Sequence, residues 1–290
     1  MPSTTAPVST LQVSVDGVRS PVRTSGPRDA REAVVFVHGN PGSSEDWSDL
    51  LGRIGSFARA VAPDMPGYGK ADRPQRFDYT IDGYARHLAG LLEALGIERV
   101  HLVLHDFGGP WGLVWAGQHP ASVASVTLIN TGVLTGYRWH KFARVWRTPV
   151  LGELMQLLAS RRRLGKLLNA DNPRPFPPEF LDRIYEDLDR GQKRAVLRLY
   201  RATSDLAALA EHAAAALGPL HLPALVVWGA GDVYLPAKFA EQQRQYFQVQ
   251  AVHVLPGCGH WPFVDEPAGV AELVVPFLRE RIASRTGPAR

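Results

Sequence analysis

The stretch Leu102-Val103-Leu104-His105-Asp106-Phe107-Gly108-Gly109 decides the fold of this chain. Its apolar residues predict a buried strand, the glycine pair predicts a tight turn, and the residues from about Pro110 predict a helix. A strained turn between a strand and a helix lifts one side chain above the sheet, and glycines allow close packing beneath it. The lifted residue here is Asp106. The alternative is an Asp that only caps the following helix, which is its commonest role at such a position.

Short β-branched runs recur along the chain, separated by helix-like segments. They lie at residues 33–37, 58–62, 100–104, 125–129, 224–228 and 252–255. This alternation predicts a mostly parallel sheet with helices on both faces. Residues 11–15 and 18–22 predict an antiparallel hairpin at the edge of the sheet, which makes about eight strands.

The alternation stops between residues 131 and 221. Long helical patterns, a Pro-rich loop at 172–178 and an Ala-rich stretch at 207–216 take its place. We therefore expect residues 1–130 and 222–290 to form the core and residues 131–221 to form a helical cap. Such a cap would cover the carboxyl ends of the strands, where ligands bind in open α/β sheets.

A second motif, His38-Gly39-Asn40-Pro41-Gly42, directly follows the predicted strand that ends at Val37. A glycine-rich turn at this place can offer a backbone N–H group to an oxyanion. Together with the N–H of the residue after the lifted Asp, it would form an oxyanion hole. We predict Asn40 and Phe107 as the two donors.

A third motif, Gly257-Cys258-Gly259-His260-Trp261-Pro262, follows the last predicted strand. Glycines on both sides favour an accessible imidazole rather than a histidine packed in the core. Asp232 comes directly after the preceding strand and can orient His260. The chain order of nucleophile, acid and histidine fits a catalytic triad, so these motifs favour Asp106 as a nucleophile over Asp106 as a helix cap.

An aspartate at this position changes the reaction that a triad can perform. A carboxylate with a reference pKa of about 3.9 is already ionised at neutral pH and needs no base to activate it. Attack on an ester would give a reactive anhydride, whereas attack on a saturated carbon gives an ordinary alkyl ester. Water activated by His260, with Asp232 behind it, can then hydrolyse that ester on Asp106. The oxyanion hole would serve this second step.

From about residue 34 to about residue 277, the chain resembles the branch of the α/β-hydrolase family that contains epoxide hydrolases and haloalkane dehalogenases. The resemblance is strongest at the Asp106 turn and at the His38 motif. It implies the α/β-hydrolase fold, with Asp106 as nucleophile, His260 as base and Asp232 as acid. Some members carry the acid after the preceding strand, where this chain has Asn130, which cannot serve as an acid.

The resemblance to epoxide hydrolases implies proton donors on the cap. Tyr200-Arg201 resembles the Tyr-Arg pair of that family, although a half-buried tyrosine of a helix is an equally good interpretation. The position of the first donor, usually a second tyrosine, holds His140, and Tyr137 and Tyr185 are further candidates. Our leading hypothesis is an epoxide hydrolase that converts an apolar epoxide into a vicinal diol.

The alternative is a haloalkane dehalogenase, because a leaving halide needs N–H donors instead of a proton. The tryptophan that usually follows the nucleophile is Phe107 here, which donates nothing from its side chain. Asn40 matches the halide-binding Asn of many dehalogenases, and Trp139 or Trp146 could supply the missing donor. Trp261, with these two tryptophans, is a candidate substrate contact.

The intact set of Asp106, Asp232 and His260 argues against a third class, a binding protein without turnover.

The formal charge of +4, from 32 basic and 28 acidic residues, is too small and scattered for a nucleic-acid surface. A solvated helix face explains the basic cluster of residues 161–163 and 166 as well as any ligand does.

The remaining composition bounds the setting of the protein. One cysteine fits a reducing compartment, and neither a secretory signal nor a membrane span is evident, so we expect a cytoplasmic protein without a membrane partner. The ten histidines lack paired metal-ligand spacing, and the mechanism needs no cofactor. We expect a small apolar organic substrate and water as partners. A homodimer is a possible oligomeric state.

Overall fold

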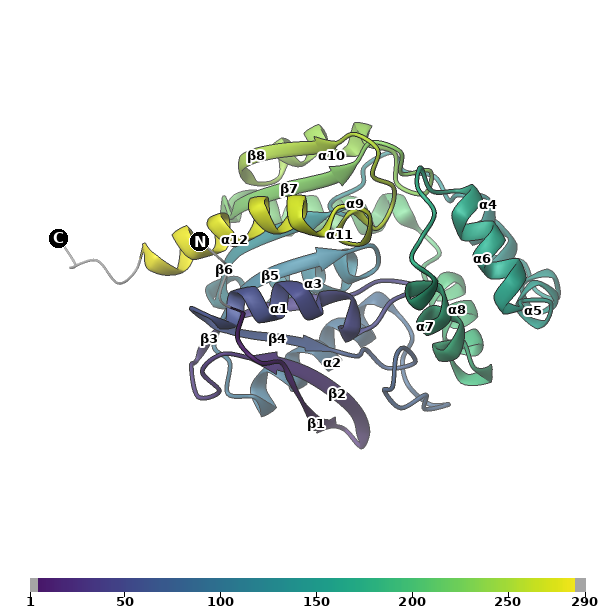
Figure 1. The fold of residues 1–290 in the computed structure, drawn as a ribbon, viewed down its shortest axis with the longest axis horizontal. Coiled ribbons are helices and arrows are strands. Elements are labelled where there is room, and N and C mark those ends of the chain that lie inside the picture. Colours follow the sequence, from purple (N-terminus) through teal and green to yellow (C-terminus); the bar gives the residue numbers. More distant parts are fainter. Residues whose placement is uncertain (1–4, 285–290) are drawn as a thin grey trace.

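The computed structural model describes residues 5–284, which fold around an eight-stranded sheet in the order β1-β2-β4-β3-β5-β6-β7-β8 (Figure 1). β1 (Ser9–Val15) and β2 (Val18–Ser25) form the antiparallel hairpin at one edge. β2 also pairs antiparallel with β4 (Arg59–Pro63). All other neighbouring strands are parallel, which confirms the predicted fold.

The centre of the sheet is buried on both faces, as the continuous apolar runs predict. Besides β4, which pairs parallel with β3, the parallel strands are β3 (Glu32–Val37), β5 (Arg99–His105), β6 (Val123–Ile129), β7 (Pro223–Gly229) and β8 (Gln248–Leu255). β8 begins before the predicted residue 252, because an edge strand alternates polar and apolar residues and its first half lacks an apolar run. Strand β8 forms the edge of the sheet opposite the hairpin.

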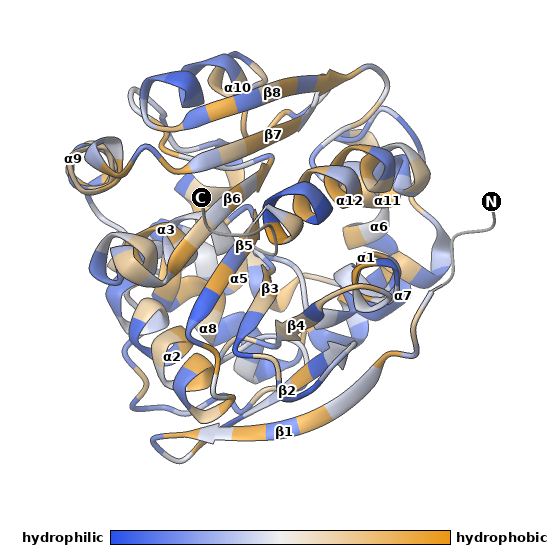
Figure 2. Cartoon of the chain, turned by 90° about the vertical axis from the view of Figure 1, so that its left-hand side faces the viewer, coloured by the Kyte–Doolittle hydropathy of each residue, from blue (hydrophilic) through white to orange (hydrophobic). Residues whose placement is uncertain are grey.

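Side chains of successive residues point to opposite faces of the sheet, so Val35 and Phe36 belong to two separate cores. The first face carries α2 (Ile81–Ala94), α3 (Gly108–Gln118) and α10 (Lys238–Gln242), and the second carries α1 (Ser48–Gly55), α11 (Pro262–Asp265) and α12 (Pro267–Ala283). Short 3-10 helices occupy Ser44–Trp47, Pro120–Ser122, Gly218–Leu220 and Gln243–Gln245. Figure 2 shows the helices striped with hydrophobic and hydrophilic residues, as expected of helices that cover a sheet with one side.

Between β6 and β7 the chain forms a run of helices. They are α4 (Lys141–Arg147), α5 (Leu151–Leu157), α6 (Arg161–Ala170), α7 (Pro178–Asp187), α8 (Arg190–Ala202) and α9 (Leu206–Leu217). Helices α4 to α8, called the cap helices below, gather beyond the carboxyl ends of the strands, whereas α9 packs against α3 of the core (Figure 1). The exact limits of a cap at residues 131 and 221 stay a prediction. No helix in the described part of the chain is both long and apolar enough to cross a membrane.

Candidate active site

Asp106 stands at the turn between β5 and α3 with a φ of +48°, a left-handed conformation that is rare for a residue with a side chain. The turn is tight, because a Cβ on Gly108 would lie 2.1 Å from the carbonyl oxygen of Val37. The Thr131 hydroxyl donates to the Asp106 carbonyl at 2.8 Å and helps to hold this conformation. Phe107 is the N-cap of α3, and no side chain caps that helix. The interpretation of Asp106 as a helix cap is therefore wrong.

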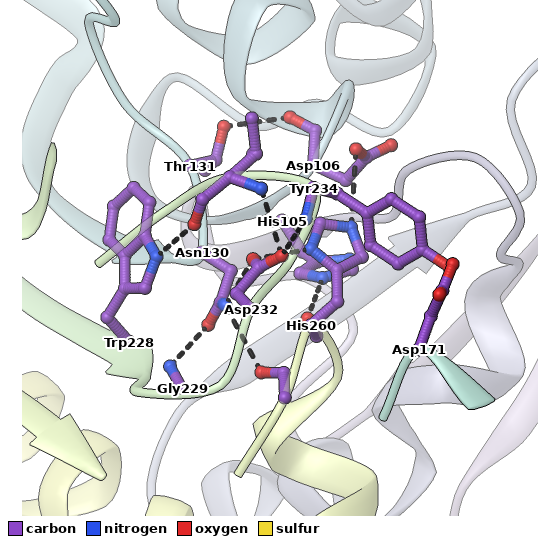
Figure 3. Close-up of polar contacts among 12 residues, drawn as sticks. His105, Asp106, Asn130, Thr131, Asp171, Trp228, Gly229, Asp232, Tyr234 and His260 are labelled. Carbon is purple, nitrogen blue, oxygen red and sulfur yellow. Dashed lines mark hydrogen bonds and ion pairs between the residues drawn. The ribbon is translucent and has the colours of Figure 1, made fainter. Parts of the chain in front are cut away.

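The structure brings Asp106, His260 and Asp232 together (Figure 3). His260 Nε2 lies 3.4 Å from Asp106 Oδ2, and His260 Nδ1 lies 2.7 Å from Asp232 Oδ2. The ring of His105 packs at a tilt against that of His260, with 4.8 Å between the centroids, and its Nε2 donates to the His260 carbonyl at 2.8 Å. His260 is thus held both through its side chain and through its backbone carbonyl.

Opposite charges fix the protonation of this group. Burial disfavours the charged form of His260, but the charge of Asp232 and the hydrogen bonds to Asp232 and Asp106 outweigh burial and raise its pKa to about 10. Burial also disfavours ionised Asp106, but the hydrogen bond and charge of His260 outweigh it and lower the pKa of Asp106 to about 2. At neutral pH the site therefore holds an imidazolium between two carboxylates.

The His38 motif lies against Asp106. The backbone N–H of Asn40 donates to Asp106 Oδ1 at 2.7 Å. A Cβ on Gly39 would lie 2.3 Å from the Cβ of Asp106, so the loop can approach this closely only with glycine there. His38 braces the loop, because its Nδ1 donates to the Gly39 carbonyl at 2.9 Å while its Nε2 accepts from a backbone N–H at 3.0 Å. The loop places one predicted oxyanion donor beside the carboxylate, and Phe107 follows that carboxylate directly in the chain.

Asn130 plays a structural part that the sequence analysis did not foresee. Its amide Nδ2 donates to Asp232 Oδ2 at 2.6 Å and to the Gly259 carbonyl at 3.2 Å, and its Oδ1 accepts from the Gly229 N–H at 3.0 Å. The other oxygen of Asp232 accepts two backbone N–H groups at 2.8 and 2.9 Å. Asn130 therefore holds Asp232 and the His260 loop in one hydrogen-bond network, although it is no acid itself.

A cavity of about 520 Å³ lies between the core and the cap helices, with Asp106 and His260 in its wall. Its remaining lining is mostly leucine, valine, methionine and aromatic side chains. A smaller cavity of about 80 Å³ lies toward α9. Both are lined by Asp106, His140, Tyr200 and Tyr234. The carboxylate thus faces a largely apolar space that suits a small apolar ligand.

Tyr200 of α8 is buried, with 2% of its surface exposed, and it lines both cavities. Its hydroxyl accepts a hydrogen bond from Asn40 Nδ2 at 3.4 Å, and within residues 5–284 its own proton has no acceptor. The ring lies between those of Trp139 and Trp146, at centroid distances of 5.3 and 4.9 Å. Burial, and then the charge of Asp106, raise the pKa of Tyr200 far above its usual value. The phenol stays protonated and can donate into the cavity.

His140 is the N-cap of α4, and its Nδ1 accepts from the Ala143 N–H at 3.3 Å. Burial lowers its pKa to about 4, so the ring is neutral at pH 7 and its hydrogen lies on Nε2. It is therefore a second N–H donor in both cavities. Tyr137 lines only the smaller cavity. Tyr185 is 36% exposed on α7 and lines neither, so the prediction of Tyr185 as an alternative donor is wrong.

The three predicted tryptophan contacts divide between the cavities. Trp146 and Trp261 line the larger one, and Trp139 lines the smaller one. Among the described residues, the buried indole N–H groups of Trp139 and Trp261 have no hydrogen-bond partner. These two groups are free to donate to a ligand.

Tyr234 is a further residue of the site to which the sequence analysis gave no role. Its ring packs edge-on against His260 at 5.2 Å, and its hydroxyl donates to Asp171 Oδ2 at 3.1 Å (Figure 3). Asp171 ends α6, and its other oxygen pairs with the Lys141 ammonium of α4 at 3.1 Å. Tyr234 therefore connects His260 to two cap helices. Its place two residues after Asp232 was the only signal in the sequence.

Comparison with known proteins gives the family of the chain. The model of the alpha/beta hydrolase fold matches residues 32–267. The chain belongs to the α/β-hydrolase family. An uncharacterised protein of Mycobacterium tuberculosis is 30% identical over 97% of this chain and 83% of its own length. The 2-hydroxy-6-oxo-2,4-heptadienoate hydrolase of Pseudomonas putida is 26% identical over 86% of this chain and 90% of its own.

Solved structures of the family share this fold over nearly the whole chain. The haloalkane dehalogenase DbeA from Bradyrhizobium elkani superposes with a TM-score of 0.83 at 24% identity, over 96% of this chain and 100% of that one. At this identity the likeness concerns the fold alone.

Proposed function

We propose that the protein is an epoxide hydrolase, which opens an apolar epoxide to a vicinal diol through an ester on Asp106. The observation that carries the proposal is the buried Tyr200 hydroxyl, whose unengaged proton lies in the same cavity as the ionised carboxylate. The N–H of His140 adds a second donor to that cavity. An epoxide needs this combination, because its oxygen leaves as an alkoxide that must be protonated.

In the first step a carboxylate oxygen of Asp106 attacks a ring carbon, and the bond from that carbon to the epoxide oxygen breaks. The oxygen takes the proton of Tyr200 while it is hydrogen-bonded to His140. The products are a neutral alkyl ester on Asp106 and a phenolate on Tyr200. This step needs no base, because Asp106 is already ionised with a pKa of about 2.

The ester changes the state of His260. Alkylation removes the negative charge of Asp106, one of the two carboxylates that keep the imidazole protonated, so the pKa of His260 falls. Its proton returns to the phenolate of Tyr200 through solvent. Neutral His260 then takes a proton from water, and the hydroxide attacks the ester carbonyl.

The second step develops a negative charge on the carbonyl oxygen, which the N–H groups of Asn40 and Phe107 would stabilise. Collapse of the intermediate expels the diol oxygen, which takes its proton back from His260. The Asp106 carboxyl then gives its proton to His260, and the resting ion pairs are restored. Atoms and charges balance with water as the only co-reactant.

The relative from Pseudomonas putida acts, by its name, on an oxo acid. We do not extend that activity to this chain, because a carboxylate that attacks a carbonyl carbon would form an anhydride. Attack on a saturated carbon gives the more stable ester.

The test combines a substrate panel with a trapping experiment. Aryl and alkyl epoxides incubated with the protein should give diols, and failure across the whole panel would overturn the proposal. His260→Gln should complete the first step and stop, because glutamine cannot activate water. Mass spectrometry of the intact protein should then show the added mass of the epoxide, with peptide mapping to Asp106. An adduct on any other residue would show that the nucleophile is assigned wrongly.

A haloalkane dehalogenase is the second candidate, and one observation favours it. The Trp139 indole N–H is buried without a partner among the described residues, and the Asn40 side chain also donates into the site. These two donors could hold a leaving halide. Release of bromide from bromoalkanes, with all epoxides inert, would support this activity in place of the first.

A further inference from the structure

Polar side chains of the core and of the cap helices line the larger cavity. Most of its polar lining surrounds Asp106, but Gln156 on α5 and Arg163 on α6 do not belong to that group. Figure 1 shows α5 at the outer end of the cap, away from the sheet. A cavity for a purely apolar ligand has no need of an amide and a guanidinium in its wall.

Gln156 is the first sign of a ligand at this outer end. Only 7% of its surface is exposed, and its side chain makes no hydrogen bond to any residue between 5 and 284. Its amide nitrogen and oxygen are not sealed off by protein, so they are open to a hydrogen-bond partner. Because this amide lines the cavity, a polar group of a bound molecule is the natural partner.

Arg163 is the second sign. Arg163 lies on the face of α6 that also carries three leucines of the cavity wall, Leu164, Leu167 and Leu168. Its guanidinium donates to the Leu158 carbonyl at 3.1 Å, and no carboxylate of the described chain lies within ion-pair distance of it. The neighbouring Arg161, in contrast, pairs with Asp182. Arg163 is therefore an exposed cation at the cavity wall that has no carboxylate partner among residues 5–284.

The start of α6 strengthens this interpretation. Its first turn carries arginines at residues 161–163 and no acidic residue. The amino end of a helix favours negative charge, so an arginine cluster there is electrostatically unfavourable. An anion bound beside Arg163 would offset both the helix dipole and the arginine charges.

We infer that the substrate is an epoxide with a hydrocarbon chain that ends in a carboxylate. The epoxide would lie between Asp106 and Tyr200, the chain along the leucine wall, and the carboxylate between Arg163 and the amide of Gln156. Arginine binds a carboxylate through two parallel hydrogen bonds, and an amide N–H completes the set. The inference rests on the proposed function for the epoxide, but the anion site itself does not.

Binding without chemistry tests the anion site. Calorimetric titration with decanoate, which has no epoxide, should show binding to the wild-type protein and much weaker binding of decan-1-ol. Arg163→Gln should weaken decanoate binding about tenfold, a modest figure because the exposed guanidinium stays partly hydrated. Arg162→Gln is the matched control, since Arg162 shares the same helical turn but does not line the cavity. Equal binding of acid and alcohol, or no effect of Arg163→Gln, would overturn the inference.

Turnover separates this inference from the proposed function. An epoxy acid and its methyl ester should differ in KM by about tenfold in the wild type, and Arg163→Gln should remove the difference by raising KM for the acid alone. Gln156→Leu should act in the same direction. If both epoxides are opened equally well by every variant, the anion site is wrong while the function stands. If no epoxide is opened but decanoate binding depends on Arg163, the function is wrong while the anion site stands.

Discussion

Tyr200→Phe removes one hydroxyl and leaves the ring in its place between Trp139 and Trp146. The hydrogen bond that is lost is long, at 3.4 Å from Asn40 Nδ2, and the amide then faces the cavity. We expect the free energy of unfolding to fall by about 1 kcal/mol or less. The effect on the first chemical step should be much larger, because the hydroxyl donates to the developing alkoxide. One such donor contributes about 3 kcal/mol, which corresponds to a loss of roughly 100-fold in rate. The N–H of His140 remains and should keep the residual rate measurable.

Single-turnover measurements can isolate this step. Enzyme in excess over an aryl epoxide is quenched over time, the ester on Asp106 is followed by intact mass, and the diol is followed by chromatography. Formation of the ester should slow about 100-fold in Tyr200→Phe, and its hydrolysis should slow much less. Tyr137→Phe is the matched control, since Tyr137 lines only the smaller cavity. A loss below threefold in ester formation, or an equal loss in both steps, would refute the role of Tyr200 as proton donor.

Two further predictions concern residues that do not line either cavity. Asn130→Ala removes a 2.6 Å hydrogen bond to Asp232 and leaves the Gly229 N–H without its acceptor. We therefore expect urea unfolding to show a free energy of unfolding that is lower by about 3 kcal/mol, together with slower hydrolysis of the ester. An unchanged free energy of unfolding would contradict the proposed network. His87 is neutral and buried, and burial lowers its pKa from 6.5 to about 4. Its stabilising effect is fully present above pH 6.5 and is lost as the pH falls toward 4, because the unfolded chain binds the proton first. This loss in the free energy of unfolding amounts to at most about 3 kcal/mol. In His87→Gln the melting temperature should therefore fall less between pH 6.5 and pH 4 than in the wild type. Identical profiles of melting temperature against pH in the two proteins would count against a neutral, buried His87.

Local signals were sufficient to predict that Asp106, Asp232 and His260 lie together. Asp106, Asp232 and the His260 loop each follow a parallel strand, and the carboxyl ends of parallel strands meet at one edge of the sheet. Their convergence therefore follows from strand order, which an alternating pattern of strands and helices already constrains. The fold was predictable for the same reason.

The supporting contacts were not predictable, because they depend on register and docking. Asn130 meets Asp232 only because β6 and β7 are neighbours in the sheet. Tyr234 can bond to Asp171 only when the cap helices pack on the core. The same packing leaves Tyr185 exposed on α7, away from the cavities. A sequence states which residues could donate, but the packing of the cap decides which of them face the cavity.

The contact of Tyr234 with Asp171 also bears on how a product escapes. Outward movement of α6 must break the bond from the phenol, and separation of α4 from α6 must break the pair between Lys141 and Asp171. Because the ring of Tyr234 also packs against His260, the contact between Tyr234 and α6 extends to the proposed base. We expect movement of α6 to change the packing around His260 at the same time.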